Sequence, residues 1–309
     1  MGQQLFAVNS LGGFLTNNVL SKKIRHAAQP LMKFRQFVDL EPAAGKSRGN
    51  KVFFDKVSNI STQGGTLNET ATIPKRNFTI TQGTLTITEY GNSIPFTLKL
   101  QTLADITVPE NIKTVLRNDM AKVLDSGAAT EFKTSDYKAT ITNTATTTFG
   151  SAGAALATSS GSLSDKNARD IVDKLKTLLV PTVDGENYVA IHSTNSIRGL
   201  YDFFEAKAQL TTMKPLFRGE VGQYYKCRHV EETNVLVNTL GSSSVDGEAV
   251  FFGSDAVREG VAIPEEIRID IPKDFGRDQG IAWYSLLGFI KTWDFSSDGE
   301  TRIIHVTSL

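Results

Sequence analysis

The stretch from residue 51 to residue 98 constrains the fold more than any other part of the sequence. Two β-type runs flank a polar segment, residues 63–70, whose composition is typical of a loop tip. From Phe78 to Ile87, apolar residues alternate with threonine, and Gly83 interrupts the run as a bulge would. The pattern predicts a long β-hairpin with little core of its own. Because a lone hairpin is marginal in water, this one needs a partner surface.

The segment before the hairpin is basic and has no regular period. Residues 1–45 cannot bury enough apolar surface to fold alone, so we expect them to dock on something else, a neighbouring subunit being one candidate. Residues 1–51 carry a net charge of +6, with Asp39 and Glu41 as the only acids against eight basic residues, while the whole chain balances 33 basic against 33 acidic residues. This neutral net charge argues against a protein whose main task is to bind nucleic acid. Two interpretations stay open: an exposed flexible arm, or an arm that faces a polyanion.

The rest of the chain predicts a mixed α+β body. A capping-box pattern at Thr107–Glu110, with proline in the first turn, predicts a helix from Val108 to Lys133 whose apolar stripe faces the core and whose weak point is Gly127. Residues 138–163 are rich in Thr, Ala, Ser and Gly and are expected to form an exposed β-excursion or loop. Two further helices and a mainly β region follow, with short strands at residues 234–237 and 249–252 among them, and residues 241–247 have the composition of a mobile loop. Strands and helices segregate along the chain, which predicts α+β rather than a doubly wound sheet.

No catalytic, metal-binding or cofactor-binding constellation stands out, so we predict that the chain is not an enzyme. The histidines are scattered without metal spacing, and no nucleophile elbow surrounds the pair His192-Ser193. Cys227 is the only cysteine, which excludes an intramolecular disulfide. The longest apolar run, residues 281–290, is too short to cross a bilayer, so no membrane partner is expected. The remaining enzyme hypothesis is a hydrolase that uses His192 or Cys227.

The order of arm, hairpin, capped long helix, small-residue region and mixed terminal body resembles the HK97-like major capsid fold of tailed bacteriophages. Three local segments carry the same resemblance, closest to capsid proteins of short-tailed phages: residues 89–94 (EYGNSI), 219–235 (GEVGQYYKCRHVEETNV) and 249–257 (AVFFGSDAV). The resemblance implies an N-terminal arm at 1–47 and an extended loop at 48–97. It further implies a peripheral domain with a long spine helix at 98–181 and 273–309, and an axial domain at 182–272.

The resemblance also implies a function. Many copies would form pentamers and hexamers that close into an icosahedral shell around double-stranded DNA, with portal and scaffolding proteins and a decoration or cement protein as partners. The protein would be found in the virion and be assembled in the cytoplasm of a host bacterium. Because the arm starts at once, a separate scaffolding protein is implied, or the scaffolding extension that some relatives carry before the arm is absent. The covalent Lys–Asn cross-link of some relatives is not expected, since no motif identifies its partners. An encapsulin-like compartment is the alternative with the same fold.

Under this hypothesis the functional residues lie on surfaces where subunits or DNA meet. Deleting residues 1–45 is expected to leave folded subunits that form no shells. The candidate inter-subunit or DNA-facing residues are Lys22, Lys23, Arg25, Lys33, Arg35, Lys46, Arg48, Gly64, Gly65, Gly241 and Gly247.

Overall fold

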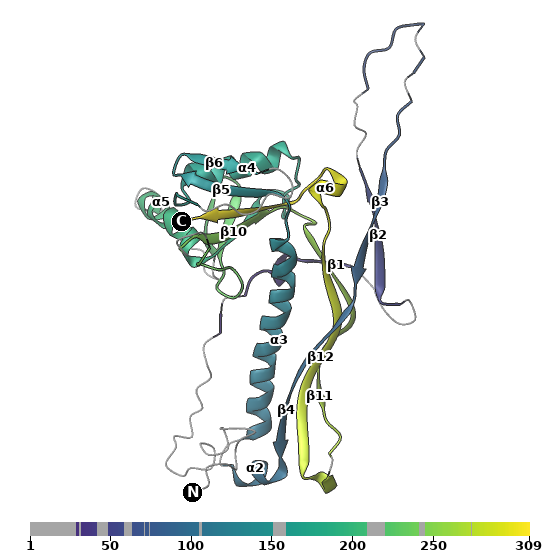
Figure 1. Cartoon of the computed structure of the whole chain (residues 1–309), viewed down its shortest axis with the longest axis vertical. Helices are drawn as coiled ribbons and strands as arrows, with labels where there is room; N and C mark the ends of the chain where they lie inside the picture. Colours follow the sequence, from purple (N-terminus) through teal and green to yellow (C-terminus); the bar gives the residue numbers. More distant parts are fainter. Residues whose placement is uncertain are drawn as a thin grey trace.

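A computed structural model shows an elongated molecule with a compact unit at one end and a thin hairpin projecting beyond it (Figure 1). The structure describes residues 29–30, 32–41, 49–58, 64–70, 72–73, 75–104, 107–150, 159–208, 220–240, 245–272 and 274–309. Of the candidate residues, Lys22, Lys23, Arg25, Lys46, Arg48 and Gly241 lie outside these ranges.

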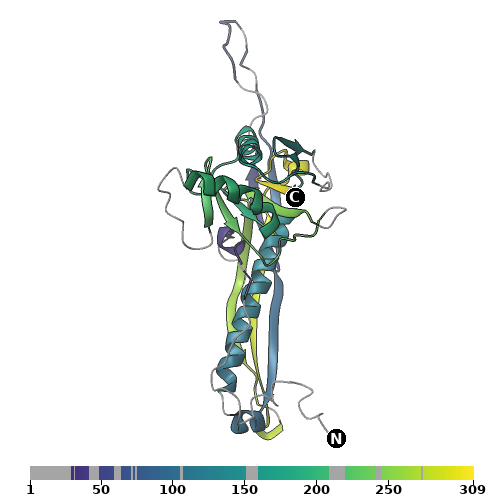
Figure 2. The ribbon, with the colours of Figure 1, turned by 90° about the vertical axis from the view of Figure 1, so that its left-hand side faces the viewer.

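The elongated unit is a long helix lying along a narrow sheet (Figures 1 and 2). The sheet has four strands in the order β1-β11-β12-β4. Helix α3 begins at Val108 and ends at Lys133, as the sequence predicted. Its packing against the sheet uses Leu116 of the helix and Trp283 of β12, both buried. The strands of this sheet are β1 (Asp39–Glu41), β11 (Val257–Ile269), β12 (Asp278–Lys291) and β4 (Thr88–Thr97). A short helix, α2 (Leu98–Leu103), follows β4 at the far end of the unit.

Two details of α3 differ from the prediction. The predicted capping box is not formed, because the Thr107 side chain makes no capping hydrogen bond and the first turn relies on proline instead. Gly127 is a close-contact position rather than a weak point: a Cβ atom there would stand 2.9 Å from the ring of Phe289 on β12. The glycine therefore lets the helix approach the sheet closely.

The compact unit is a seven-stranded mixed sheet in the order β6-β5-β13-β10-β7-β9-β8. Its two faces are covered by different helices. Ala190 and Phe251 pack against α4 (Asp165–Thr177), whereas Val189, Ile191 and Phe252 pack against the last turns of α3. This alternation along β7 and β10 explains why every residue of both strands is buried. The strands are β6 (Thr146–Phe149), β5 (Lys138–Asn143), β13 (Ile303–Ser308), β10 (Gly247–Phe252), β7 (Tyr188–His192), β9 (Cys227–Glu231) and β8 (Glu220–Tyr224).

The sheets divide the chain differently from the predicted domain boundaries. Strand β11, expected in an axial domain at 182–272, belongs to the sheet of the elongated unit. Strands β5 and β6, expected in a peripheral domain or an exposed excursion, belong to the compact sheet, and so does β13. The reason is long-range pairing: β13 lies parallel to β5 and antiparallel to β10, so the chain end returns to the compact unit. Residues 234–237, predicted as a strand, are irregular.

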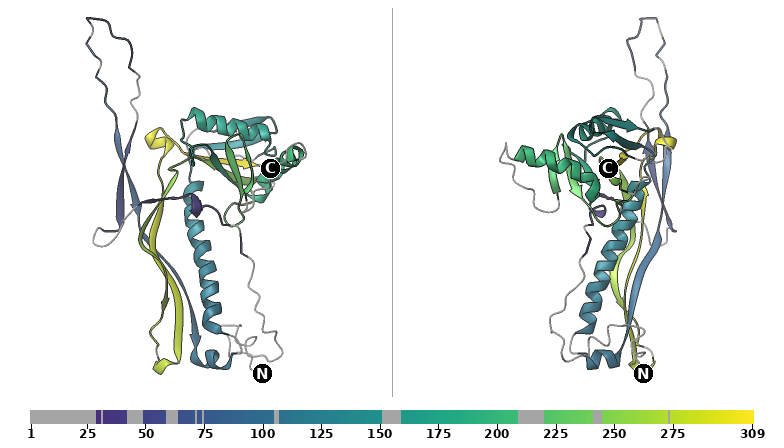
Figure 3. Two further views of the ribbon diagram at one scale, coloured as in Figure 1. Left: turned by 180° about the vertical axis from the view of Figure 1, so that it is seen from behind. Right: turned by 60° about the vertical axis from the view of Figure 1, so that its left-hand side comes forward.

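The projecting hairpin consists of β2 (Lys51–Val57) and β3 (Ile80–Thr86), and β3 leads directly into β4 (Figures 1 and 3). The strands pair antiparallel from Lys51 opposite Thr86 to Val57 opposite Ile80, without a register shift. The predicted bulge at Gly83 is therefore wrong. Gly83 lies opposite Phe54, and a Cβ atom there would stand 2.3 Å from the Phe54 ring, so the glycine makes room for that ring.

Candidate assembly surfaces

The hairpin presents large apolar side chains to solvent along most of its length. Phe53, Val57, Phe78 and Ile80 are exposed on or beside its strands, and Leu67 and Ile73 are exposed near its tip. Scattered apolar residues are ordinary on a surface, but a monomer has no reason to keep six large ones exposed in a row along a thin projection. We call this row the hairpin patch. Among the described residues of the hairpin, contact with the rest of the subunit is confined to its base.

The base of the hairpin sits in a notch made by two glycines. Gly260 on β11 and Gly288 on β12 lie directly opposite each other in the sheet. A Cβ atom on Gly288 would stand 2.2 Å from the backbone oxygen of Thr86, and one on Gly260 would stand 2.7 Å from the Leu85 side chain. Leu85 is fully buried there and packs with Phe54 and Ile87. The two glycines therefore let the hairpin backbone cross the sheet in contact with it.

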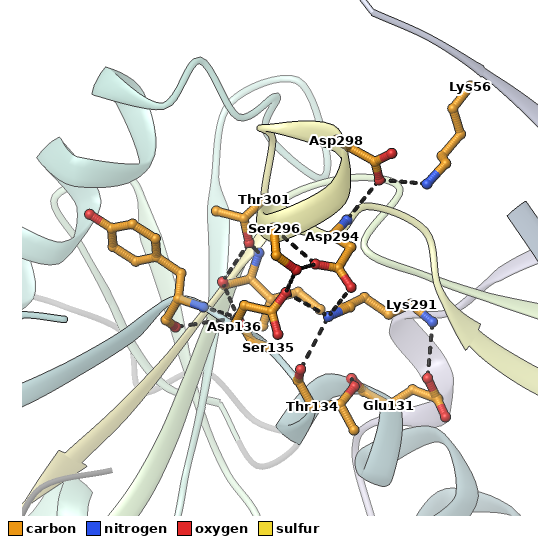
Figure 4. Close-up of polar contacts among 12 residues, drawn as sticks. Lys56, Glu131, Thr134, Ser135, Asp136, Lys291, Asp294, Ser296, Asp298 and Thr301 are labelled. Atoms are coloured by element: carbon orange, nitrogen blue, oxygen red, sulfur yellow. Dashed lines mark hydrogen bonds and ion pairs between the residues drawn. The ribbon is translucent and has the colours of Figure 1, made fainter. Parts of the chain in front are cut away.

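A second contact ties the hairpin to α6 (Phe295–Asp298), a single helical turn near the chain end (Figure 4). The Lys56 ammonium of β2 pairs with an Asp298 carboxylate oxygen at 2.5 Å, and the Thr81 hydroxyl of β3 donates to the other oxygen at 3.2 Å. The side chains of Lys56 and Asp298 are only 10% and 3% exposed. Lys56 also lies 5.8 Å from the ring centre of Trp293. One residue from each strand of the hairpin, Lys56 of β2 and Thr81 of β3, thus contacts the Asp298 carboxylate, and we call this contact the α6 clamp.

The clamp in turn rests on a polar cluster that joins α6 to the end of α3 (Figure 4). Lys291 of β12 reaches Asp136 at 3.5 Å and Asp294 at 3.4 Å, and Ser296 donates to both carboxylates. A hydrogen bond with Asp136, together with those from Ser296 and the charge of Lys291, holds the pKa of Asp294 well below its usual range despite partial burial. Asp294 also caps α6. The hairpin is therefore positioned by rigid elements of the body.

The described end of the arm docks on its own subunit. Phe34 is fully buried, with its ring 5.4 Å from that of Phe132 on α3. The backbone amides of Phe34 and Arg35 donate to Asp125 at 2.8 and 3.1 Å. The Arg35 guanidinium pairs with Glu259 at 2.8 Å and Glu265 at 2.6 Å. Burial acts to lower the pKa of Arg35, but these two glutamates outweigh it, so the pKa is raised and the charge is satisfied within the chain.

These contacts bear on two expectations. Arg35 ties the arm to β11, because its two carboxylate partners come from that strand, and its role at a subunit or DNA surface stays a prediction. Deletion of residues 1–45 was predicted to leave folded subunits, but it would remove Phe34 from the core. Lys33 precedes these contacts and is half-buried. Its role toward DNA stays a prediction, as does that of the basic residues outside the described ranges.

The candidate glycines fall into two groups. Gly64 and Gly65 are exposed on the hairpin, with nothing within 4 Å of a Cβ atom at either position. Gly247 is buried at the start of β10, where a Cβ atom would stand 2.6 Å from the Ser193 hydroxyl oxygen. Its position differs from the mobile, exposed loop that the composition predicted, because the strand packs against the start of α5 (Thr194–Ala208).

The residues of the hydrolase hypothesis are buried and do not form a catalytic arrangement. His192 contacts His229 through Nε2 and Nδ1 at 2.9 Å, while the Ser193 hydroxyl accepts a hydrogen bond from the backbone amide of Glu248. Burial raises the pKa of the Cys227 thiol, which leaves it a poor nucleophile. Among the described residues there is no group of three or more potential metal ligands. Within the same ranges, no helix is both long and apolar enough to span a membrane.

The histidine pair has one measurable consequence. Burial lowers the pKa of His229 to about 4, and burial together with the charge of His229 lowers the pKa of His192 well below its usual value. Both rings are therefore neutral in the folded chain near neutral pH. Below pH ~6.5 the unfolded chain binds protons that the folded chain does not, so this part of the stability is lost as the pH falls from about 6.5 toward about 4.

Sequence reasoning missed an apolar surface at the far end of the elongated unit. Leu98 and Leu103 of α2 are exposed there, and so are Ile269, Ile271 and Phe275 at the turn between β11 and β12. The alternation of Ile267, Ile269 and Ile271 with charged residues predicts a strand, but which part of that strand stays exposed depends on tertiary packing that a local pattern does not show.

Comparison with solved structures places this architecture. A capsid chain of Ralstonia phage GP4 aligns over 94% of both chains with a TM-score of 0.68 and 14% sequence identity. The capsid of cyanophage P-SCSP1u aligns over 95% of this chain and 93% of that chain, with a TM-score of 0.66 and 10% identity. A chain of Mycobacterium phage Che8 aligns over 94% and 96%, with a TM-score of 0.64 and 15% identity. No protein-family model and no curated protein matches the sequence.

The chain therefore has the HK97-like fold of phage capsid proteins, and the predicted fold class is confirmed. The alignment spans nearly the full length of this chain and of its neighbours, so the match includes most of both units. At such low identity the similarity concerns the fold, and function needs a separate argument.

Proposed function

We propose that this chain is the major capsid protein of a tailed bacteriophage and that many copies assemble into an icosahedral shell. The observation that carries the proposal is the hairpin patch: a thin projection with exposed apolar side chains, held rigidly at its base by the glycine notch and the α6 clamp. A projection that is fixed at its base and exposes apolar side chains is suited to contact a second subunit. The similarity to phage capsid chains over almost the whole length supports the same function.

Closed symmetric assembly explains how such contacts suffice. A standard stable interface buries roughly 1,600 Å². An arm and a hairpin together can exceed that area, and every copy in a closed shell makes the same contacts several times, so that effective concentration multiplies them. We infer pentamers and hexamers as the building units, with portal and scaffolding proteins and a decoration or cement protein as further partners. Assembly in the cytoplasm of the host belongs to the same proposal.

The DNA contact is the least specific part of the proposal. The candidate contacts are the basic arm residues Lys22, Lys23, Arg25, Lys33, Lys46 and Arg48, which would meet phosphate without reading bases. Binding of this kind weakens steeply with salt. Sequence-selective or salt-insensitive binding by the free subunit would contradict it.

Shortening the hairpin tests the proposal. The strand pairing closes at Ser58, whose hydroxyl donates to the Thr79 oxygen at 3.0 Å, so residues 59–78 can be replaced by a short Asn-Gly turn without touching the base. The shortened chain should unfold at the same temperature as the wild type yet form no shells in electron micrographs. Normal shells from it would reject the role of the hairpin. Wild-type shells that carry protein cargo and no nucleic acid would instead indicate a storage compartment.

A further inference from the structure

The turn between β11 and β12 forces a phenylalanine into solvent. Phe275 is fully exposed, at 105% of its reference area. Asp274, Phe275 and Gly276 all have positive φ angles, of 45°, 55° and 87°. Left-handed backbone is unfavourable for residues with a side chain, and an aspartate and a phenylalanine in succession add to that strain. The turn therefore holds an apolar side chain away from its own subunit in a fixed direction.

A groove lies beside this turn, between it and α2. Its volume is about 680 Å³, and Leu98 and Leu103 form its apolar wall. Asp274 and Arg277 line the groove from the turn, whereas Phe275, between them in sequence, does not. The backbone amide of Leu98 donates to the Arg277 oxygen at 3.0 Å, so the two sides are joined. Since a cavity of ~150 Å³ can hold benzene, the groove has room for one phenylalanine ring.

The charges around the groove complement those of the turn. On the turn, Asp274 pairs loosely with Arg277 at 3.5 Å, and both side chains are more than half exposed. In the groove, Lys99 and Asp278 have no ion-pair partner among the described residues. A second turn that enters the groove would place its acid near Lys99 and its base near Asp278. The groove thus fits a second copy of this chain.

We propose that Phe275 of one subunit inserts between Leu98 and Leu103 of the next, so that the far ends of the elongated units join around a rotation axis. The inference rests on the proposed function as a shell protein. Knob and groove are different surfaces of one chain, which makes the contact heterologous, and a heterologous contact repeats until it closes a ring. Because both surfaces lie at the same end of the molecule, the ring is small.

The contact is too small to hold two free subunits together. A phenylalanine buries about 150–250 Å², far below the area of a stable interface. It therefore forms only when hairpin contacts already bring the subunits together. Loss of Phe275 should accordingly spare small assembly intermediates and prevent their closure into shells.

Substitution gives the first test. Phe275→Ala should leave the thermal unfolding of the subunit unchanged and abolish closed shells in electron micrographs. The matched control is Leu179→Ala, because Leu179 is also exposed, at 84%, and also has a positive φ, of 57°, but lies in the compact unit. The control should form normal shells. Normal shells from Phe275→Ala would overturn the inference.

Cysteine pairing gives the direct test. A chain with Phe275→Cys and Leu103→Cys should form a disulfide-linked ladder when its small assembly intermediates are oxidised, and Cys227 does not interfere because it is buried. Neither single variant should form a ladder. Links in Phe275→Cys alone would show that two turns meet each other, which contradicts a knob in a groove. If wild-type chain forms no shells, the proposed function fails; if it forms shells and the double variant stays unlinked, only this inference fails.

Discussion

Replacing Lys56 by methionine should release the hairpin from the body while leaving the body folded. The ammonium of Lys56 is the only positive charge that the described structure gives Asp298, and methionine keeps most of the aliphatic stem. Without the ammonium, the Asp298 carboxylate, 3% exposed, is left as a negative charge in a poorly hydrated place. The hairpin then loses one of its two attachments and depends on the glycine notch alone.

The structure sets the size of the effect. Removing one partner of a buried ion pair costs about 3–5 kcal/mol. Asp298 would keep two donors, the Thr81 hydroxyl at 3.2 Å and the backbone amide of Asp294 at 3.0 Å, so we expect about 2–3 kcal/mol, taken from that range less what these bonds retain. Lys113→Met is the matched control, since the Lys113–Glu110 pair is exposed on α3 and should contribute little to the unfolding free energy.

Hydrogen exchange measures the effect where it occurs. Amides of β2 and β3 should exchange faster in Lys56→Met by a factor of roughly 30–150, the equivalent of about 2–3 kcal/mol, while amides of α3 and β10 keep their wild-type rates. Shells should also form less efficiently, because the hairpin no longer points in one direction. Unchanged exchange in both strands would refute the view that the α6 clamp positions the hairpin.

Other predictions concern the arm, the histidine pair and the glycine notch. Deleting residues 1–28 should leave the unfolding free energy unchanged, whereas deleting residues 1–41 should lower it by about 3–5 kcal/mol because Phe34 leaves the core; equal urea midpoints for the two deletions would contradict this. His229→Gln should reduce the loss of stability on acidification, by about 2 kcal/mol near pH ~5, a figure that follows from the pKa of about 4 in the fold; parallel stability curves for variant and wild type would exclude the proposed cause. Gly288→Ala should destabilise the hairpin base by about 1–3 kcal/mol, since the new methyl group meets backbone, while Gly64→Ala should be neutral; urea titrations of both variants decide the point, and a tolerated Gly288→Ala would argue against the notch.

The order of elements made the fold predictable. Helix α3 has the predicted ends at Val108 and Lys133, and α4 begins after the Ser164 cap, because these features depend on neighbours in sequence. The exposed alternating hairpin could also be predicted, since its period is local. The role of Gly83 could not be predicted, because glycine is required at this position by the Phe54 ring on the partner strand.

The attachments of the hairpin and arm were beyond sequence reasoning because they join distant residues. Lys56 and Asp298 are 242 positions apart, and Arg35 and Glu259 are 224 apart. Nothing near Lys56 distinguishes it from the other lysines of the hairpin, and Arg35 looked like one more charge of a basic arm. For the same reason, the sheet to which β11 and β13 belong could be assigned only from the strand pairing in the structure. The local sequence pattern therefore identified the hairpin and the arm, while the contacts that fix their orientation were found only in the structure.

The most direct test of the central claim is cryo-electron microscopy of the purified wild-type protein. The proposal predicts closed icosahedral shells whose subunit density fits this chain, with each hairpin lying across a neighbouring subunit. A monomer or a small soluble oligomer, at concentrations where shells of this fold should form, would contradict it.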